Sequence, residues 1–285
     1  MLEESVYMTQ PVGFVEGVDM VWRLLWSVYG LKQALHMWYK KLWGLLEHFG
    51  FRGSEVDHAL FITKLVHSGM PIHCLMAVHV DDGMAAANSR AFLDWVKVEI
   101  WKEFGLKDLG PVVKFLGMEF KRNRATHKLW ISQVEYIDSI LAEYGLTNCN
   151  PVHTPIDPLH LWGRPTDNLD TYLAMSNVLL KSSYKCIIGH LLFLVLCTCP
   201  NRQASVCLLS QFCSSPEVGH MFAAKHFKFL RYLKGTRTLA LHYGGVLKDD
   251  PLATHCDADW ANDPADQLSI SGYIWSVVGD NVEQL

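Results

Sequence analysis

The sequence predicts a mixed α+β fold built from short strands and amphipathic helices. Apolar residues recur at helical spacing from Lys32 to Phe49, and this pattern ends at Gly50. The pattern then changes to the alternation typical of a strand in residues 71–84 (PIHCLMAVHVDDGM). Half of the 285 residues are apolar, so the chain can bury a core in one large or two modest domains.

The other elements follow in order along the chain. Residues 3–17 predict a short strand that is broken by Pro11 and Gly13. Residues 71–84 predict a β-hairpin with Asp81 and Asp82 at its tip. Further helices are expected at 89–104, 133–144, 182–198, 202–213 and 217–233, and further strands at 112–120, 128–132, 240–245, 253–260 and 271–279.

Two segments mark the organisation of the second half. Residues 147–170 are rich in Pro, Asn and Asp, which is typical of a linker. The apolar run 186–199 contains His190 and stops at Pro200, short of the roughly 20 residues that cross a bilayer. We therefore expect a buried helix there and no membrane partner.

Charge and cysteine content exclude some functions. A formal net charge of −4 argues against nucleic-acid binding by bulk electrostatics, so any such surface must be a local patch. The candidate patch consists of five basic residues that recur every three positions in a predicted helix: Lys225, Lys228, Arg231, Lys234 and Arg237. A solvated helix face explains this spacing as well as a face that follows the phosphates of a nucleic acid. The eight cysteines form no CxxC pair and no signal peptide precedes them, so we expect reduced intracellular thiols.

Asp81 and Asp82 are the candidate chemical site. Like charges at close range raise each other's affinity for protons, and a divalent cation removes this conflict. Mg²⁺ prefers oxygen ligands, often one or two carboxylates together with substrate phosphates, as in two-metal nucleotidyl transfer. A polar turn completed by Gly83 is the simpler alternative, and for an arbitrary Asp-Asp-Gly it is the more frequent one.

Eight segments decide between these alternatives. They are VYMTQPVGF (6–14), LLWSVYGLKQALHMWYKKL (24–42), VHVDDG (78–83), FGLKDLGPVVKFLGMEF (104–120), ISQVEYIDSIL (131–141), YKCIIGHLLFL (184–194), AAKHFKFLRYLKGT (223–236) and CDADWA (256–261). In this order and spacing they resemble the successive motifs of the Ty1/copia-type reverse transcriptase, the RNA-directed DNA polymerase of a retrotransposon Pol polyprotein. The resemblance covers nearly the whole chain and favours the metal site.

The resemblance implies the architecture of a right-hand polymerase, truncated at both ends. Residues 1–146 would form part of the fingers and palm, including the primer grip. Residues 147–181 would be a linker, 182–245 a helical thumb and connection, and 246–285 the first strands of an RNase H-like domain.

The resemblance also implies residue roles. Asp81 and Asp82 would be the paired catalytic carboxylates of the palm and would hold Mg²⁺ or Mn²⁺. Gln33 matches the position that contacts the incoming dNTP, and Lys32 beside it would contact phosphate or simply be solvated. Asp257 would be the first RNase H carboxylate, although Asp-x-Asp by itself is more often a solvated turn. The basic residues of 225–234 would contact the RNA/DNA primer–template.

Several positions depart from the family pattern. The family carries a third palm carboxylate upstream of the VYM segment, and the sequence begins at Met1 inside that region, so we expect this ligand to be absent. The family's Tyr before Val-Asp-Asp is His79 here, which puts a titratable ring beside the metal site. Leu35 and His36 replace an expected Pro-Arg, and Cys199-Pro200 replaces Arg-Pro.

Two functions are therefore expected from the sequence. The first is a fragment of an RNA-directed DNA polymerase whose own activity is doubtful, because one metal ligand is missing. The alternative is a catalytically inactive retrotransposon remnant that at most binds nucleic acid. Zinc chemistry is not expected, since HExxH and paired Cys/His spacings are absent, and no GxSxG nucleophile elbow occurs.

Overall fold

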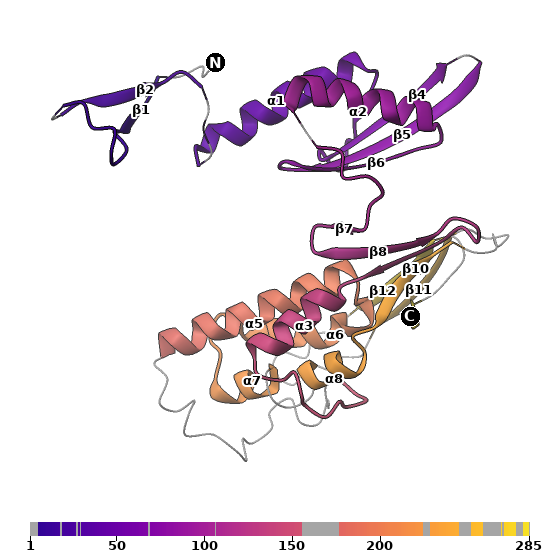
Figure 1. Cartoon of the computed structure of the whole chain (residues 1–285). Coiled ribbons are helices and arrows are strands. Elements are labelled where there is room, and N and C mark those ends of the chain that lie inside the picture. The colour runs from indigo at the N-terminus through magenta and orange to yellow at the C-terminus, as the bar shows by residue number, and fades with distance from the viewer. Residues whose placement is uncertain are drawn as a thin grey trace. The chain divides into compact units, whose positions relative to one another are not determined.

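The fold was analysed in a computed structural model, which describes residues 5–17, 19–26, 28, 30–67, 69–105, 107–155, 177–224, 229–244, 252–258, 269, 271–277 and 282–284. The chain divides into two compact units, Met1–Val112 and Val113–Leu285 (Figure 1). Both units combine helices with small antiparallel sheets, so the expected α+β class is confirmed.

The first unit contains a four-stranded antiparallel sheet in the order β3-β4-β5-β6. Two helices, α1 and α2, lie along one face of this sheet (Figure 1). A separate hairpin of β1 and β2 precedes them. The bounds are β1 Val6–Thr9, β2 Val21–Leu24, α1 Lys32–His48, β3 Arg52–Gly53, β4 Leu60–His67, β5 Met70–His79, β6 Asp82–Ala87 and α2 Arg90–Phe104.

The core of the first unit explains these elements. Alternate side chains of β5 are buried, which confirms the predicted strand periodicity. They pack against leucines of α1 and aliphatic side chains of α2; the buried set comprises Leu42, Leu46, Phe49, Phe51, Phe61, Cys74, Met76, Val78, Val96 and Ile100. Helix α2 is capped at its start by Ser89, whose side chain accepts a hydrogen bond from the Phe92 amide, and at its end by Gly105 in the left-handed conformation.

The second unit holds a five-stranded antiparallel sheet in the order β13-β10-β9-β8-β7, and β11 pairs with β12 in a separate ladder. Strand β10 lies beside β9, although more than one hundred residues of chain separate them. The bounds are β7 Lys114–Phe115, β8 Met118–Asn123, β9 Lys128–Ser132, β10 Leu239–Tyr243, β11 Leu252–Ala258, β12 Ser271–Val277 and β13 Val282–Gln284.

Helices supply the core of the second unit. Helix α5 is central, and it contributes seven buried side chains: Leu180, Tyr184, Ile187, Ile188, Leu191, Leu194 and Val195. Around it pack buried side chains from four shorter helices. The bounds are α3 Val134–Glu143, α5 Asn177–Cys197, α6 Gln203–Ser210, α7 Val218–Phe222 and α8 Phe229–Gly235, with 3-10 turns at Pro200–Arg202 and Gln211–Cys213.

Two expectations from the sequence were wrong in detail. The single strand expected at 112–120 is a hairpin of β7 and β8, because Leu116 and Gly117 both adopt positive φ, of 48° and 75°. The apolar helix is also longer than the run 186–199 suggested. Helix α5 has 21 residues, and Val178–Cys197 is long and apolar enough to cross a membrane by length and composition alone, a test that a soluble core helix also passes.

The unit boundary falls inside the segment expected as one domain. The predicted fingers and palm extend to residue 146, whereas β7, β8, β9 and α3 cluster with the helical second unit. The predicted linker lies largely outside the described residues. The domain boundaries 1–146, 147–181, 182–245 and 246–285 therefore stay predictions.

Candidate nucleotidyl-transfer site

Asp81 and Asp82 lie at the tip of the β5–β6 hairpin, as the sequence predicted. Asp82 is the first residue of β6 and lies opposite His79 in the antiparallel register, so Val80 and Asp81 form the turn. Val80 adopts φ of 55°. A β-branched residue rarely occupies this region, and holding it there costs about 1–3 kcal/mol. The hairpin therefore maintains backbone strain directly beside the carboxylates.

Both carboxylates are available to a ligand. Asp81, Asp82 and Gly83 are all exposed. Within the described part of the chain, neither Asp side chain forms a hydrogen bond or an ion pair. Two adjacent, solvent-facing carboxylates form an all-oxygen donor set, which suits Mg²⁺ or Mn²⁺ better than a softer cation.

Few other metal-binding side chains of the described residues lie near Asp81 and Asp82. Searched over the described residues, no third His, Cys, Asp or Glu donor joins Asp81 and Asp82 in a compact group. His79 is also exposed and sits at the end of β5, across the ladder from Asp82. Its ring is therefore next to the pair in the strand register, as expected from its position before Val-Asp-Asp.

Gln33 and Lys32 lie at the start of α1. Lys32 is the first residue of this helix, which follows Leu31 in extended conformation. The side chains of both residues lie outside the described part of the structure. Their assignment to the incoming nucleotide stays a prediction.

The expected basic patch is only partly described. Lys225 and Lys228 lie outside the described residues, whereas Arg231 and Lys234 belong to α8. Arg231 Nε donates to the main-chain oxygen of Asn150 at 2.7 Å, so part of its hydrogen-bonding capacity is used within the chain. Lys234 is half-buried in the last turn of α8.

Arg237 has a structural partner of its own. Its guanidinium Nη1 lies 2.7 Å and 2.8 Å from the two carboxylate oxygens of Asp138 on α3. This ion pair joins α3 to the segment that leads into β10. Arg237 therefore contributes to the packing of the second unit as well as to its positive charge.

The segment that resembles the primer grip forms the β8–β9 hairpin. Glu119 on β8 accepts hydrogen bonds from the amides of Val134 and Glu135 at 3.2 Å and 2.8 Å. These amides open α3, whose own N-cap residue makes no capping hydrogen bond with its side chain. The carboxylate therefore fixes the helix to the hairpin.

Asp257 lies near the end of β11, opposite Gly272 of β12. It is exposed, and one carboxylate oxygen accepts a 2.9 Å hydrogen bond from the Ala258 amide. This local contact fits a polar strand end, and the RNase H role stays a prediction.

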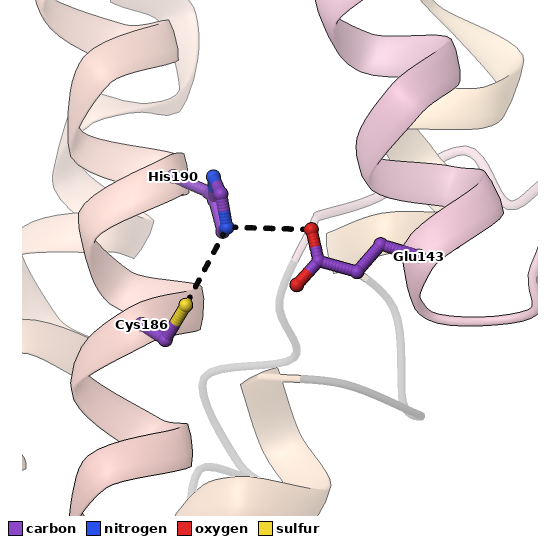
Figure 2. Close-up of side chains that lie close together, drawn as sticks. All are labelled: Glu143, Cys186 and His190. Atoms are coloured by element: carbon purple, nitrogen blue, oxygen red, sulfur yellow. Dashed lines mark hydrogen bonds and ion pairs between the residues drawn. The ribbon is translucent and has the colours of Figure 1, made fainter. Parts of the chain in front are cut away.

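Sequence reasoning missed a second group of ligand-type side chains. Glu143, Cys186 and His190 converge between α3 and α5 (Figure 2). Cys186 and His190 are four residues apart on a helix, and that spacing was the available signal. Glu143 is brought to them only by tertiary packing.

Comparison with known proteins identifies the family. The family described as reverse transcriptase (RNA-dependent DNA polymerase) matches residues 1–158. The retrovirus-related Pol polyprotein from transposon TNT 1-94 of Nicotiana tabacum is 33% identical over 280 residues, which are 98% of this chain and 20% of that protein. The corresponding polyprotein from transposon RE1 of Arabidopsis thaliana is 34% identical over 277 residues, 96% of this chain and 18% of that protein.

A shorter relative matches almost end to end. The putative transposon Ty5-1 protein of Saccharomyces cerevisiae is 32% identical over 284 residues, which are 98% of this chain and 86% of that protein. No solved structure shows a significant similarity. The chain thus spans about one fifth of the plant polyproteins that it matches and most of the yeast protein. It belongs to the reverse transcriptase family of Ty1/copia-type retrotransposon Pol polyproteins, of which it covers one part.

Proposed function

We propose that the chain supplies the paired palm carboxylates of an RNA-directed DNA polymerase, with Asp81 and Asp82 holding Mg²⁺ or Mn²⁺. The observation that carries this proposal is the placement of both side chains, exposed and without partners in the described residues, at one strained hairpin tip in a chain of this family. A bound divalent cation would lower the pKa of a primer hydroxyl and neutralise charge on the incoming triphosphate.

The protein's own residues would hold and orient the substrates. The β5–β6 ladder fixes the position of both carboxylates, and buried side chains of β5 anchor that ladder to α1 and α2. Gln33 and Lys32, at the start of α1, would contact the dNTP. Residues 182–245 would serve as thumb and connection, and Arg231, Lys234 and their basic neighbours would contact the primer–template.

A second candidate function is a catalytically silent remnant that at most binds nucleic acid. His79, opposite Asp82, favours this candidate. Its imidazole lies beside the carboxylates at the position of the family's tyrosine, so the packing of that tyrosine against the primer end would be lost. The two candidates differ in whether the hairpin tip binds metal and supports extension.

Primer extension on a homopolymer RNA template distinguishes them. The full chain would be assayed with Mg²⁺ or Mn²⁺ beside the double variant Asp81→Asn, Asp82→Asn and a control, Glu55→Gln, which removes an exposed carboxylate elsewhere in the first unit. Extension by the native chain and the control, lost in the double variant, supports the polymerase.

Two binding measurements address the outcome in which the chain extends no primer. Mn²⁺ binding would be followed by paramagnetic relaxation of water, and RNA binding by fluorescence anisotropy. A folded chain that binds RNA without extending a primer supports the silent module. Mn²⁺ binding that is identical in the native chain and the double variant contradicts the assignment of Asp81 and Asp82.

A further inference from the structure

Three side chains with metal-binding atoms meet between α3 and α5, far in sequence from the carboxylate pair. Glu143 is the last residue of α3, while Cys186 and His190 face it from successive turns of α5 (Figure 2). Within the described residues this is the single group in which three such donors come within 4.8 Å of one another. Cys186 and Glu143 are exposed and His190 is about one-quarter exposed, so an ion could reach them.

The two separations from the imidazole nitrogen match those that a tetrahedral ion imposes on its ligands. His190 Nε2 lies 3.6 Å from Cys186 Sγ and 3.5 Å from Glu143 Oε2. With Zn–S of ~2.3 Å, Zn–N of ~2.05 Å and Zn–O of ~2.1 Å, tetrahedral angles place sulfur about 3.6 Å and oxygen about 3.4 Å from the nitrogen. An ion could therefore enter with little movement of the imidazole.

The other ring nitrogen of His190 is already oriented. His190 Nδ1 lies 2.8 Å from the hydroxyl oxygen of Tyr136. A metal-binding imidazole usually directs its second nitrogen to such a partner, which fixes the tautomer and the plane of the ring. The Tyr136 hydroxyl oxygen can accept a hydrogen bond from Nδ1–H, which leaves the Nε2 lone pair free for an ion.

We propose that Glu143, Cys186 and His190 form a Zn²⁺ site, with the fourth position open to water. A thiolate and an imidazole select a borderline-soft cation over Mg²⁺, and the thiolate with the carboxylate balances its two charges. The ion would connect the C-terminal end of α3 to the middle of α5. The site is separate from Asp81 and Asp82 and does not depend on polymerase activity.

A Cys-His nucleophile pair is the alternative use of these side chains. In such a pair the third residue orients the histidine through the nitrogen that faces away from the sulfur, and Tyr136 at Nδ1 would match that role. Glu143 does not match it, because its carboxylate lies at Nε2, the nitrogen that would have to take the proton of the Cys186 thiol. Convergence of an oxygen and a sulfur on one nitrogen is the arrangement expected around a shared cation.

Zinc affinity of the full reduced chain tests the proposal. The chain would be stripped of metal and titrated with Zn²⁺ against a chromophoric chelator, and with Co²⁺ to detect sulfur-to-cobalt charge transfer. One site per chain is expected. Cys186→Ser should abolish the charge-transfer band and lower the affinity for Zn²⁺ at least tenfold. Glu143→Gln and His190→Gln should each lower the affinity by a similar factor, and Tyr136→Phe should lower it about tenfold because the imidazole ring is no longer held in place.

Matched controls separate this site from the other thiols and from the proposed polymerase site. Cys207→Ser removes another exposed cysteine of the second unit and should leave Zn²⁺ affinity unchanged. The double variant Asp81→Asn, Asp82→Asn should also retain it. The proposal is overturned if the folded native chain binds Zn²⁺ no more tightly than Cys186→Ser, or if Cys207→Ser weakens binding equally.

Discussion

Arg202 Nη2 donates to the main-chain oxygen of Thr236 at 3.1 Å, although the arginine side chain is completely buried. Its Nη1 donates to Cys199 Sγ at 2.8 Å, and its guanidinium lies 5.2 Å from the ring centroid of Tyr232. Within the described residues no carboxylate pairs with it. Hydrogen bonds and the face of an aromatic ring stabilise this buried charge, and they connect the start of α6 to the end of α8.

The first prediction follows from this contact. Arg202→Ala should lower the free energy of unfolding of the second unit by about 3 kcal/mol or more, because it leaves a cavity and removes the hydrogen bonds from the guanidinium to Thr236 and Cys199. Urea unfolding followed by circular dichroism measures the change. Arg122→Ala, which removes an exposed arginine of β8, should change stability by less than about 0.5 kcal/mol. Equal effects of the two variants would contradict the structural role.

The second prediction concerns the capping of α3 by Glu119. Glu119→Gln should destabilise the second unit by about 1 kcal/mol, because the amide keeps one oxygen acceptor but loses the charge that favours a helix N-terminus. Glu119→Ala should cost about 2 kcal/mol, since it removes both acceptors. Thermal unfolding at low ionic strength measures the series. An unchanged midpoint for Glu119→Ala would show that the hairpin does not hold the helix.

Sequence patterns predicted those elements that local residues determine. Helix α2 has a Ser89 cap and a left-handed Gly105, both visible as sequence signals. The β5–β6 hairpin combines strict alternation with a polar tip. Strand β4 escaped prediction because the polar Thr63 shares its buried face with Phe61, and the hydroxyl of Thr63 donates to the Gly50 oxygen at 2.8 Å, while the apolar Ile62 between them is half-buried. A simple alternation of apolar and polar residues does not detect such a strand.

The two candidate sites also differ in how far the sequence could predict them. Asp81 and Asp82 are adjacent in sequence, so a hairpin prediction was sufficient to place them together. The contact of Glu143 with Cys186 and His190 requires α3 to pack against α5, and no local pattern encodes that packing. The break of β7 and β8 at Leu116 also escaped prediction, because leucine seldom adopts positive φ and carries no turn signal.

The third prediction concerns Gly244, which follows β10 with φ of +96°. A Cβ atom there would lie 1.9 Å from the main-chain oxygen of His127, so both the backbone conformation and the contact require glycine. Gly244→Ala should therefore disrupt the β9–β10 pairing and destabilise the second unit by about 2 kcal/mol or more. Hydrogen exchange of the β9 amides measures the loss of pairing.

Gly145 provides the matched control. It also adopts positive φ, of +69°, but a Cβ atom there would meet no atom within 4 Å. Gly145→Ala should cost only the conformational strain, about 1 kcal/mol, and should leave β9 protection intact. Similar effects of the two substitutions would mean that the clash with His127 is relieved by small movements of the chain.

The fourth prediction is a pH dependence caused by His220. Burial lowers the pKa of this imidazole, and the nearby Glu217 carboxylate only partly opposes the shift. The ring stacks on Phe212 at 3.9 Å between centroids, and its Nδ1 accepts a 2.9 Å bond from the Glu217 amide. Because this acceptor nitrogen must be unprotonated, the folded state favours the neutral ring.

The sign of the effect follows from proton binding. Below the unfolded-state pKa of about 6.5, the unfolded chain takes up a proton at this residue that the folded chain resists. This contribution to stability is therefore fully present above about pH 6.5 and is lost as the pH falls toward the lowered folded-state pKa. Urea unfolding between about pH 5 and 7.5 should show a free energy of unfolding that rises with pH. His220→Gln should reduce the slope of that dependence, whereas His153→Gln, at an exposed position, should leave it unchanged. A slope that survives His220→Gln would assign the dependence to other groups.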